Sequence, residues 1–332
     1  MKTIHLLIAD LFLPPELGVS TDLNLSSLRK ILARSKKSSA FTSMPMSLEN
    51  HLSRLFAVPC CPDAPIAAVS AAFDGMGEGC WVRADPVHLH LQRDRLMLSQ
   101  PETDLSEAKI LCAALNDYFA GQGMTFFAPH AARWYLRLDK LPELETTPLS
   151  QVVGRNVRGL LPRGKEATHW HKVLNEIQML LYAQPVNEAR ETRGLMPINS
   201  LWLWGCGANA APQKTYEQVS SDEDLAGMFA AAAGVPFAKL SSHWQSENHR
   251  QLLVFAGLSQ ALRNQDLEAW RAALQQFETG YAKPLWQALR SGKIACLQVD
   301  ILCQGQSLQL TRADTWALWR RNQSLADYTI KE

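Results

Sequence analysis

Apolar and polar residues follow two different periods along this chain. Residues 3–9 and 252–256 are nearly continuous apolar runs, as expected for strands that are covered on both faces in a parallel sheet. Elsewhere, as in residues 166–183, apolar side chains recur at helical spacing, and residues 222–233 form an alanine-rich helical segment. Strands that alternate with helices predict an α/β protein with a mainly parallel sheet flanked by helices.

The hydrophobic period changes near Cys80 and changes back near Asn199. Residues 88–97 and 133–138 alternate between polar and apolar positions, which is typical of antiparallel strands and hairpins. We therefore expect two domains. Residues 1–78 and 200–332 should build the core with the parallel sheet, and residues 80–198 should form an inserted α+β domain. The length of 332 residues suits about two domains of ordinary size.

Composition excludes several classes of function. The 33 basic and 32 acidic side chains nearly balance, which argues against a general nucleic-acid binder. No apolar run approaches the roughly 18 residues of a membrane span, and the N-terminal run is too short for a signal peptide. The seven cysteines include no Cys-x-x-Cys pair, and scattered thiols of this kind are typical of a reducing compartment. We predict a cytoplasmic protein that binds neither nucleic acid nor membrane.

A first polar cluster lies within residues 81–88. It contains Arg83, Asp85 and His88 beside a proline that stiffens the chain. An arginine offers a bidentate fork to phosphate or carboxylate, and Asp85 can orient either Arg83 or His88. An Arg83–Asp85 pair that only holds a domain junction is an equally good interpretation. A second polar cluster, Asn187 and Arg190, follows a helix break at Pro185 and is ambiguous by itself.

Two stretches resemble archaeal-type cofactor-independent phosphoglycerate mutases. Residues 184–190 read Gln-Pro-Val-Asn-Glu-Ala-Arg, and residues 199–207 read Asn-Ser-Leu-Trp-Leu-Trp-Gly-Cys-Gly. Residues 81–89 and 314–321 resemble more closely a bacterial family of regulatory proteins of the RpfE type, which is itself a distant relative of the mutases. The resemblance is strongest over residues 80–207. It implies an alkaline-phosphatase-like α/β core with an inserted second domain.

The mutases transfer a phosphoryl group through a serine nucleophile beside two divalent metals, which are held mainly by Asp and His. This chain departs from that pattern at its first two motifs. Asp10 corresponds to the first metal-binding aspartate, but Leu11 replaces the glycine that follows it. The segment that should carry an Asn-Ser pair reads Cys60-Cys61-Pro62-Asp63, without serine or histidine.

The chain also departs from the two later motifs. After the strand at 252–256 the family has an aspartate and a histidine four residues apart, whereas residues 259–262 read Ser-Gln-Ala-Leu. The last histidine of the chain is His249, so no imidazole is left for a terminal Asp-His metal motif. We therefore predict no bound metal and no cofactor. Asp10 and Asp63 are the residual candidates for catalysis.

These departures favour a non-catalytic protein on a mutase-like scaffold, with a regulatory or anion-binding role. The alternative is an active mutase-like phosphotransferase or phosphatase with a rebuilt site. We predict that a small phosphorylated or carboxylate ligand, if bound, lies between the domains, and a protein partner is a further expectation. The expected ligand-binding residues are Arg83, Asp85, His88, Asn187 and Arg190. In the competing arrangement Arg83 pairs with Asp85, and Arg190 pairs with Glu188 or Glu191.

Overall fold

The computed structural model divides the chain into two units. The first unit comprises residues 1–52 and 214–332, and the second comprises residues 53–213. The described residues are 2–13, 23–38, 46–60, 63–208, 210–245, 249–263, 266–317, 319–321, 323 and 325–328.

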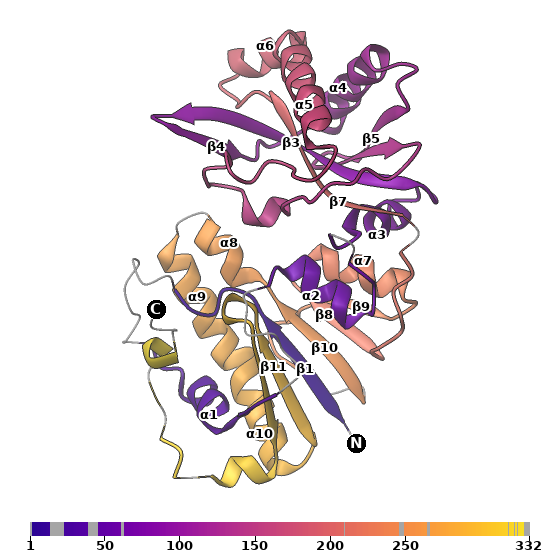
Figure 1. The fold of residues 1–332 in the computed structure, drawn as a ribbon. Helices are drawn as coiled ribbons and strands as arrows, with labels where there is room; N and C mark the ends of the chain where they lie inside the picture. Colours follow the sequence, from indigo (N-terminus) through magenta and orange to yellow (C-terminus); the bar gives the residue numbers. More distant parts are fainter. Residues whose placement is uncertain are drawn as a thin grey trace. The chain divides into compact units, whose positions relative to one another are not determined.

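A seven-stranded sheet forms the centre of the first unit, in the order β2-β12-β11-β1-β10-β8-β9 (Figure 1). The central strand β1 (Thr3–Ile8) pairs in parallel with β10 (Arg250–Phe255) and β11 (Cys296–Ile301). Beyond β10, β8 (Gln218–Ser221) and β9 (Phe237–Lys239) continue the parallel part, and β12 (Gln306–Thr311) and β2 (Lys36–Lys37) close the other edge antiparallel. The predicted α/β class, with a mainly parallel sheet flanked by helices, is confirmed.

The two faces of this sheet differ in chemistry. Ile4, Leu6 and Ile8 point to an apolar face because alternate side chains of a strand lie on opposite sides. That face packs against α1 (Ser26–Arg34), α8 (Gly257–Arg263), α9 (Leu267–Phe277), the π-helical turn η3 (Glu278–Ala282) and α10 (Lys283–Ser291). The opposite face carries His5 and Asp300. It is covered by α2 (Leu48–Leu55) and, over β8, by α7 (Asp224–Ala232) (Figure 1).

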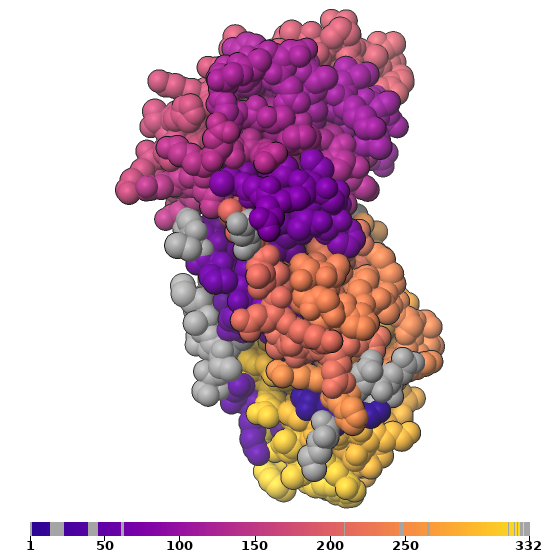
Figure 2. Space-filling view, turned by 90° about the vertical axis from the view of Figure 1, so that its right-hand side faces the viewer, coloured from indigo at the N-terminus to yellow at the C-terminus, as the bar shows by residue number. Residues whose placement is uncertain are grey.

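The first unit is assembled from both ends of the chain. Its first strand is bracketed by strands that begin at residues 250 and 296, so the earliest and latest parts of the sequence share one sheet. On the surface, indigo atoms of the N-terminal segment emerge between orange and yellow atoms of the C-terminal part (Figure 2). Contacts that are remote in sequence therefore hold this unit together.

The second unit is built on an antiparallel sheet around one long strand, β3 (Cys80–Gln92). β3 pairs with β4 (Arg95–Ser99), β6 (Arg133–Leu138) and β7 (Ser200–Ala208), and β5 (Met124–His130) pairs with β6. One face packs against α4 (Leu105–Tyr118) and α5 (Ala167–Tyr182), with α6 (Pro185–Thr192) beside α4 (Figure 1). On the other face, Ala67 and Ala71 of α3 (Ile66–Phe73) pack against Trp81 and Tyr135.

The limits of the units differ from those expected from the hydrophobic period. The contacts place them at 52/53 and 213/214, instead of near 79 and 199. The change of period marks where β3 begins, but two neighbouring elements complete the same sheet. β7 pairs with β3 from Cys80↔Ala208 to Val87↔Ser200, and α3 packs on both strands. Residues 53–78 and 200–213 therefore belong to the second unit.

The helices of both units are short. The longest described helix, α5, has 16 residues, fewer than the roughly 20 that span a bilayer. Within the part of the chain that the structure describes, no helix has both the length and the apolar character of a membrane span.

Candidate functional site

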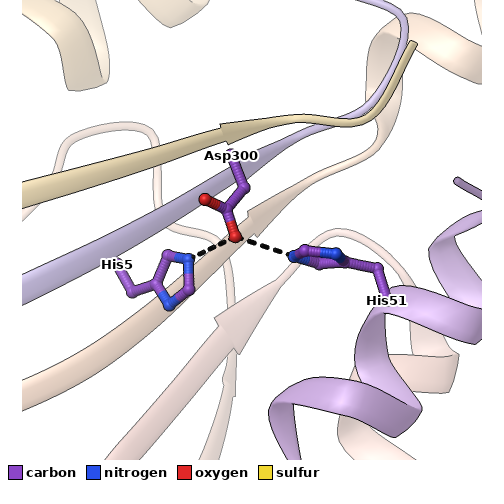
Figure 3. A group of neighbouring side chains, drawn as sticks. All are labelled: His5, His51 and Asp300. Atoms are coloured by element: carbon purple, nitrogen blue, oxygen red, sulfur yellow. Dashed lines mark hydrogen bonds and ion pairs between the residues drawn. The ribbon is translucent and has the colours of Figure 1, made fainter. Parts of the chain in front are cut away.

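Two imidazoles and one carboxylate meet on the face of the first unit's sheet that α2 covers (Figure 3). Nε2 of His5, from β1, lies 2.8 Å from Oδ2 of Asp300, from β11. Nε2 of His51, from α2, lies 2.8 Å from the same oxygen. Both rings point at this oxygen in Figure 3, and potential ligand atoms of the three residues all lie within 4.8 Å of one another.

The register of the sheet accounts for this meeting. β1 and β11 run in parallel with Leu7 beside Asp300 and His5 beside Gln298, so His5 and Asp300 are diagonal neighbours on one face. His5 is 295 residues from Asp300, and His51 is 249 residues from it. No local motif in the sequence marks such a group.

The group is almost completely buried. His51 and Asp300 have no exposed surface, and His5 is 6% exposed. Burial alone would raise the pKa of Asp300, but hydrogen bonds from His5 and His51 outweigh it and hold the pKa well below its usual value. Asp300 is therefore an anion inside the protein.

Further polar groups fix the orientation of the trio. Nδ1 of His5 lies 2.7 Å from the hydroxyl of Tyr216, so the second ring nitrogen of that imidazole is also engaged. The side-chain amide of Gln298 donates to the other oxygen of Asp300 at 3.3 Å. The rings of His5 and Tyr216 also pack against each other, with centroids 5.9 Å apart. Such partners hold the His5 ring and the Asp300 carboxylate in position.

The arrangement has two chemical capacities. Two imidazole nitrogens and one carboxylate oxygen are a donor set that zinc and other transition metals accept. The same groups also form a closed hydrogen-bond network in which each imidazole donates a proton to Asp300. Because the side chains are buried, their neighbours are protein atoms, and catalysis on a substrate at this point is not supported.

Arg83 and Asp85, predicted ligand-binding residues, form a tight pair in the second unit. Nη2 of Arg83 donates to both oxygens of Asp85, at 2.6 and 2.8 Å. The guanidinium lies over the rings of Tyr135 and Trp204, 5.4 and 5.1 Å from their centroids. The indole of Trp204 and the backbone N–H of Trp134 also donate to Asp85. The Arg83–Asp85 pair is the alternative to ligand binding that the sequence left open.

The other three predicted ligand-binding residues share one backbone segment, residues 196–198, which leads into β7. His88 donates from Nδ1 to the carbonyl of Pro197 at 2.9 Å. Asn187 accepts from the N–H of Ile198 and donates to its carbonyl. Arg190 donates from Nε to the carbonyl of Met196. These three side chains are therefore anchors for the segment.

The charge of Arg190 has a partner other than those expected. Its guanidinium binds the carboxylate of Glu107 and the carbonyl of Glu102, whereas pairing with Glu188 or Glu191 was expected. Arg193 binds the other oxygen of Glu107. All five predicted ligand-binding residues lie in the second unit, and anion binding by them stays a prediction. An anion would have to displace Asp85 from Arg83, or Glu107 from Arg190.

Asp10 and Asp63, the residual catalytic candidates, belong to different units. Asp10 follows β1 with a φ of 50°, a left-handed conformation that few residues other than glycine adopt, and its carbonyl accepts from the indole of Trp270. Asp63 accepts from the backbone N–H of Thr146 at 2.7 Å. Cys61 and Pro62, from the expected nucleophile segment, lie outside the described residues.

Asp63 lines a cavity of about 370 Å³ inside the second unit. Burial raises the pKa of Asp63, although its hydrogen bonds from Thr146 oppose the change. Two carboxyl groups, from Asp63 and Glu145, and the guanidinium of Arg163 belong to residues that line it. The lining residues are Asp63, Glu145, Thr146, Thr147, Gly159, Leu160, Leu161 and Arg163.

The carboxyl ends of the parallel strands are where open α/β sheets usually bind ligands. Asp10 follows β1, and Asp222, Glu223 and Asp224 follow β8. Asp222 is already engaged, because its two oxygens accept from the N–H groups of Ala256 at 2.8 Å and Gly257 at 2.7 Å, and burial raises its pKa. Residues 256–263 after β10 and 302–304 after β11 contain neither a carboxylate nor a histidine.

Comparisons with known proteins agree with the resemblance to the mutases over part of the chain. The chain is 32% identical over 111 residues to the 2,3-bisphosphoglycerate-independent phosphoglycerate mutase of Methanosarcina barkeri, covering 33% of this chain and 27% of that enzyme. The corresponding enzyme of Methanosarcina mazei is 35% identical over 103 residues, covering 30% and 26%. The chain thus matches about a quarter of the length of these relatives. No protein-family model matches it.

A solved structure shares the fold of this chain over most of its length. The PH0037 protein from Pyrococcus horikoshii matches with a TM-score of 0.51 at 11% identity, over 93% of this chain and 87% of that one. A cofactor-independent phosphoglycerate mutase from Thermoplasma acidophilum matches with a TM-score of 0.43 at 16% identity, over 94% and 90%. At 11% identity, the likeness to PH0037 concerns the fold alone.

Proposed function

We propose that this protein is a non-catalytic regulatory protein on a scaffold related to that of cofactor-independent phosphoglycerate mutases, and that it does not interconvert phosphoglycerates. Its action then rests on binding a small phosphorylated or carboxylate ligand, or a protein partner. The partial sequence similarity to the mutases supports the relationship of the scaffold. The proposal of inactivity depends on the chemistry of one edge of the sheet.

The proposal rests on the small number of metal-binding side chains at the carboxyl ends of β1, β8, β10 and β11. Two-metal phosphoryl transfer needs ions that stabilise both the attacking and the leaving oxygen. Each ion requires about four or more ligands, usually including water. Among the residues that directly follow these strands, Asp10, Asp222, Glu223 and Asp224 supply carboxylates. Both oxygens of Asp222 accept backbone N–H groups, and Asp224 pairs with Lys239. Asp10 and Glu223 remain, and two carboxylates are too few for two ions.

The buried histidines of the first unit do not replace the missing ligands. His5 lies in the middle of β1, five residues before Asp10, and the rise of a strand is about 3.3 Å per residue. The backbone of His5 is therefore on the order of 15 Å from that of Asp10. Together with the burial of His51 and Asp300, this separation supports a role for the trio that is independent of phosphoryl transfer.

The test is an assay of 2- and 3-phosphoglycerate interconversion by the purified full chain with magnesium, manganese or zinc. The mutase of Methanosarcina barkeri is the positive control. We expect no turnover above background, because a functional two-metal centre contributes several kcal/mol of transition-state stabilisation. Asp10→Asn is the informative variant, since asparagine tolerates a positive φ, and Asp94→Asn in an exposed turn is its control.

Turnover that Asp10→Asn abolishes and Asp94→Asn leaves intact would overturn the proposal in favour of an active mutase with a rebuilt site. Equal background rates in the native chain and both variants support it. Binding of 3-phosphoglycerate, measured by calorimetry on the same preparation, tests the ligand separately. Heat that disappears in Arg83→Lys, but remains in the exposed Arg137→Lys, would place the ligand at the predicted residues.

A further inference from the structure

We infer that His5, His51 and Asp300 bind one divalent transition-metal ion, of the zinc class, inside the first unit. This site goes beyond the proposed function, and it differs from the expectation of no metal that the sequence alone gives. Its ligands would be Nε2 of both imidazoles and one carboxylate oxygen, which already face a common point (Figure 3).

The distances allow an ion with a small adjustment. Two ligands about 2.0–2.1 Å from a tetrahedral zinc ion lie about 3.3–3.4 Å apart. Each Nε2 is 2.8 Å from Oδ2 of Asp300, and suitable ligand atoms of all three residues lie within 4.8 Å of one another. Small rotations of the side chains are therefore sufficient. Three protein ligands leave a fourth position for water.

The charge of the group also favours a cation. Asp300 is a carboxylate with no exposed surface, and a buried anion requires a compensating positive charge. In the described part of the chain, the ion pairs of Asp300 are with His5 and His51, and no lysine or arginine pairs with it. A divalent ion provides the missing charge and replaces the protons that the two Nε2 atoms otherwise share with Asp300.

The surroundings of the trio suit a metal as well. When Nε2 of His5 binds an ion, the neutral ring carries its proton on Nδ1, which lies 2.7 Å from the Tyr216 hydroxyl, a group able to accept it. Gln298 donates to the second oxygen of Asp300. Metal-bound histidines almost always have such an outer partner, and its loss typically weakens metal binding about 10–100-fold.

The ion would join three elements that are remote in sequence. β1, α2 and β11 each supply one ligand, so the site closes loops of 249 and 295 residues. A site that forms only in the folded chain binds its ion with a free energy that adds to the stability of the fold. The proposed role is therefore structural, and it requires no access of substrate.

The direct test uses the untagged full chain after removal of metals with a chelator. Zinc is titrated by calorimetry, and cobalt by its visible ligand-field absorption. We expect one ion per chain, a melting temperature that rises with zinc, and an X-ray absorption spectrum at the zinc edge that contains two imidazoles. Absence of stoichiometric zinc and cobalt binding, or a bound ion with fewer than two imidazole ligands, would overturn the inference.

Variants locate the ion. His51→Gln and Asp300→Asn should each weaken zinc binding by at least about 100-fold, and Tyr216→Phe by about 10–100-fold. His169→Gln, an exposed histidine of α5, is the matched control and should bind zinc as the native chain does. Unchanged affinity in His51→Gln would contradict the site. If a variant does not fold, the stoichiometry and spectrum of the native chain decide. Phosphoglycerate turnover is scored separately, so either proposal can fail alone.

Discussion

Each unit contains an aspartate without exposed surface, and the two carboxylates have different partners. Asp85 in the second unit pairs with Arg83, whose guanidinium also contacts two aromatic rings. Asp300 in the first unit faces two imidazoles. Both aspartates are fully hydrogen-bonded anions, yet the chemistry of their partners differs.

The difference lies in what the positive partner can exchange. A guanidinium stays protonated in proteins and has no free lone pair, so the Arg83–Asp85 pair is a fixed structural element. An imidazole can donate a proton or bind an ion through the same nitrogen. The group around Asp300 can therefore exchange its shared protons for a metal ion while the surrounding fold stays the same. A buried aspartate therefore indicates a ligand site only when its partners are exchangeable.

The largest effect is expected from Arg83→Met. The change leaves Asp85 buried without its cation and should lower the free energy of unfolding by about 3–5 kcal/mol. Urea denaturation followed by circular dichroism measures it. The double variant Arg83→Met/Asp85→Leu should recover much of this loss, because the buried charge is gone. Arg137→Met, at an exposed arginine over the Trp81 ring, should cost less than about 1 kcal/mol. Equal losses in both single variants would contradict the assigned role of Arg83.

A smaller effect is expected at the second buried pair of the same unit. Glu107 binds Arg190, which is 1% exposed, and also Arg193, whose side chain is 54% exposed. Glu107→Gln should cost about 1.5–3 kcal/mol, because the buried guanidinium keeps only neutral partners. Arg193→Ala should cost less than about 1 kcal/mol, because its half of the contact is solvated. The same denaturation measurements test this prediction. A larger loss in Arg193→Ala than in Glu107→Gln would show that solvent exposure does not make the Arg193 contact the weaker one.

The smallest effect is expected from Asp74, at the end of α3. Burial would raise the pKa of Asp74, but hydrogen bonds from Arg133 and Tyr135 outweigh it and lower the pKa. The ionised form therefore stabilises the fold above the unfolded pKa of about 4, and this contribution, at most about 1 kcal/mol, is lost as the pH falls below it. The difference in urea midpoint between the native chain and Asp74→Asn should shrink from pH 7 to pH 3. A difference that is constant with pH would refute the assignment.

The sequence predicts individual helices and strands better than it predicts which of them come into contact. The apolar run at residues 3–9 and the alternation at 133–138 become β1 and β6 nearly without change, because their patterns reflect local burial. Asp104, a residue type favoured at the start of helices, precedes α4, and its carboxylate accepts from the N–H of Ser106. The contact-based limits of the units, at 52/53 and 213/214, differ from the limits expected from the hydrophobic period, because strand pairing across residues 80–208 leaves no signature in that period.

The metal-competent trio escaped prediction for a related reason. Asp300 is 295 residues from His5 and 249 residues from His51, and the register of β1 on β11 brings His5 near Asp300. One signal was available for two of the three residues. His5 and Asp300 are ionisable side chains within strands and have apolar neighbours, whereas His51 lies in the helix α2. The polar clusters that did attract attention, Arg83 with Asp85 and Asn187 with Arg190, proved to be engaged with protein partners.

The first unit is assembled from both ends of the chain, and this has a consequence for synthesis on the ribosome. β1 emerges first, but its partners β10 and β11 end at residues 255 and 301. At about 5–20 residues per second, the central strand waits roughly 12–50 s for its first parallel neighbour. All strands of the second unit are completed during this interval. The nascent chain therefore carries the apolar segment 3–8 without its parallel partner until β10 has been made, and a segment of this kind is prone to aggregate until it pairs.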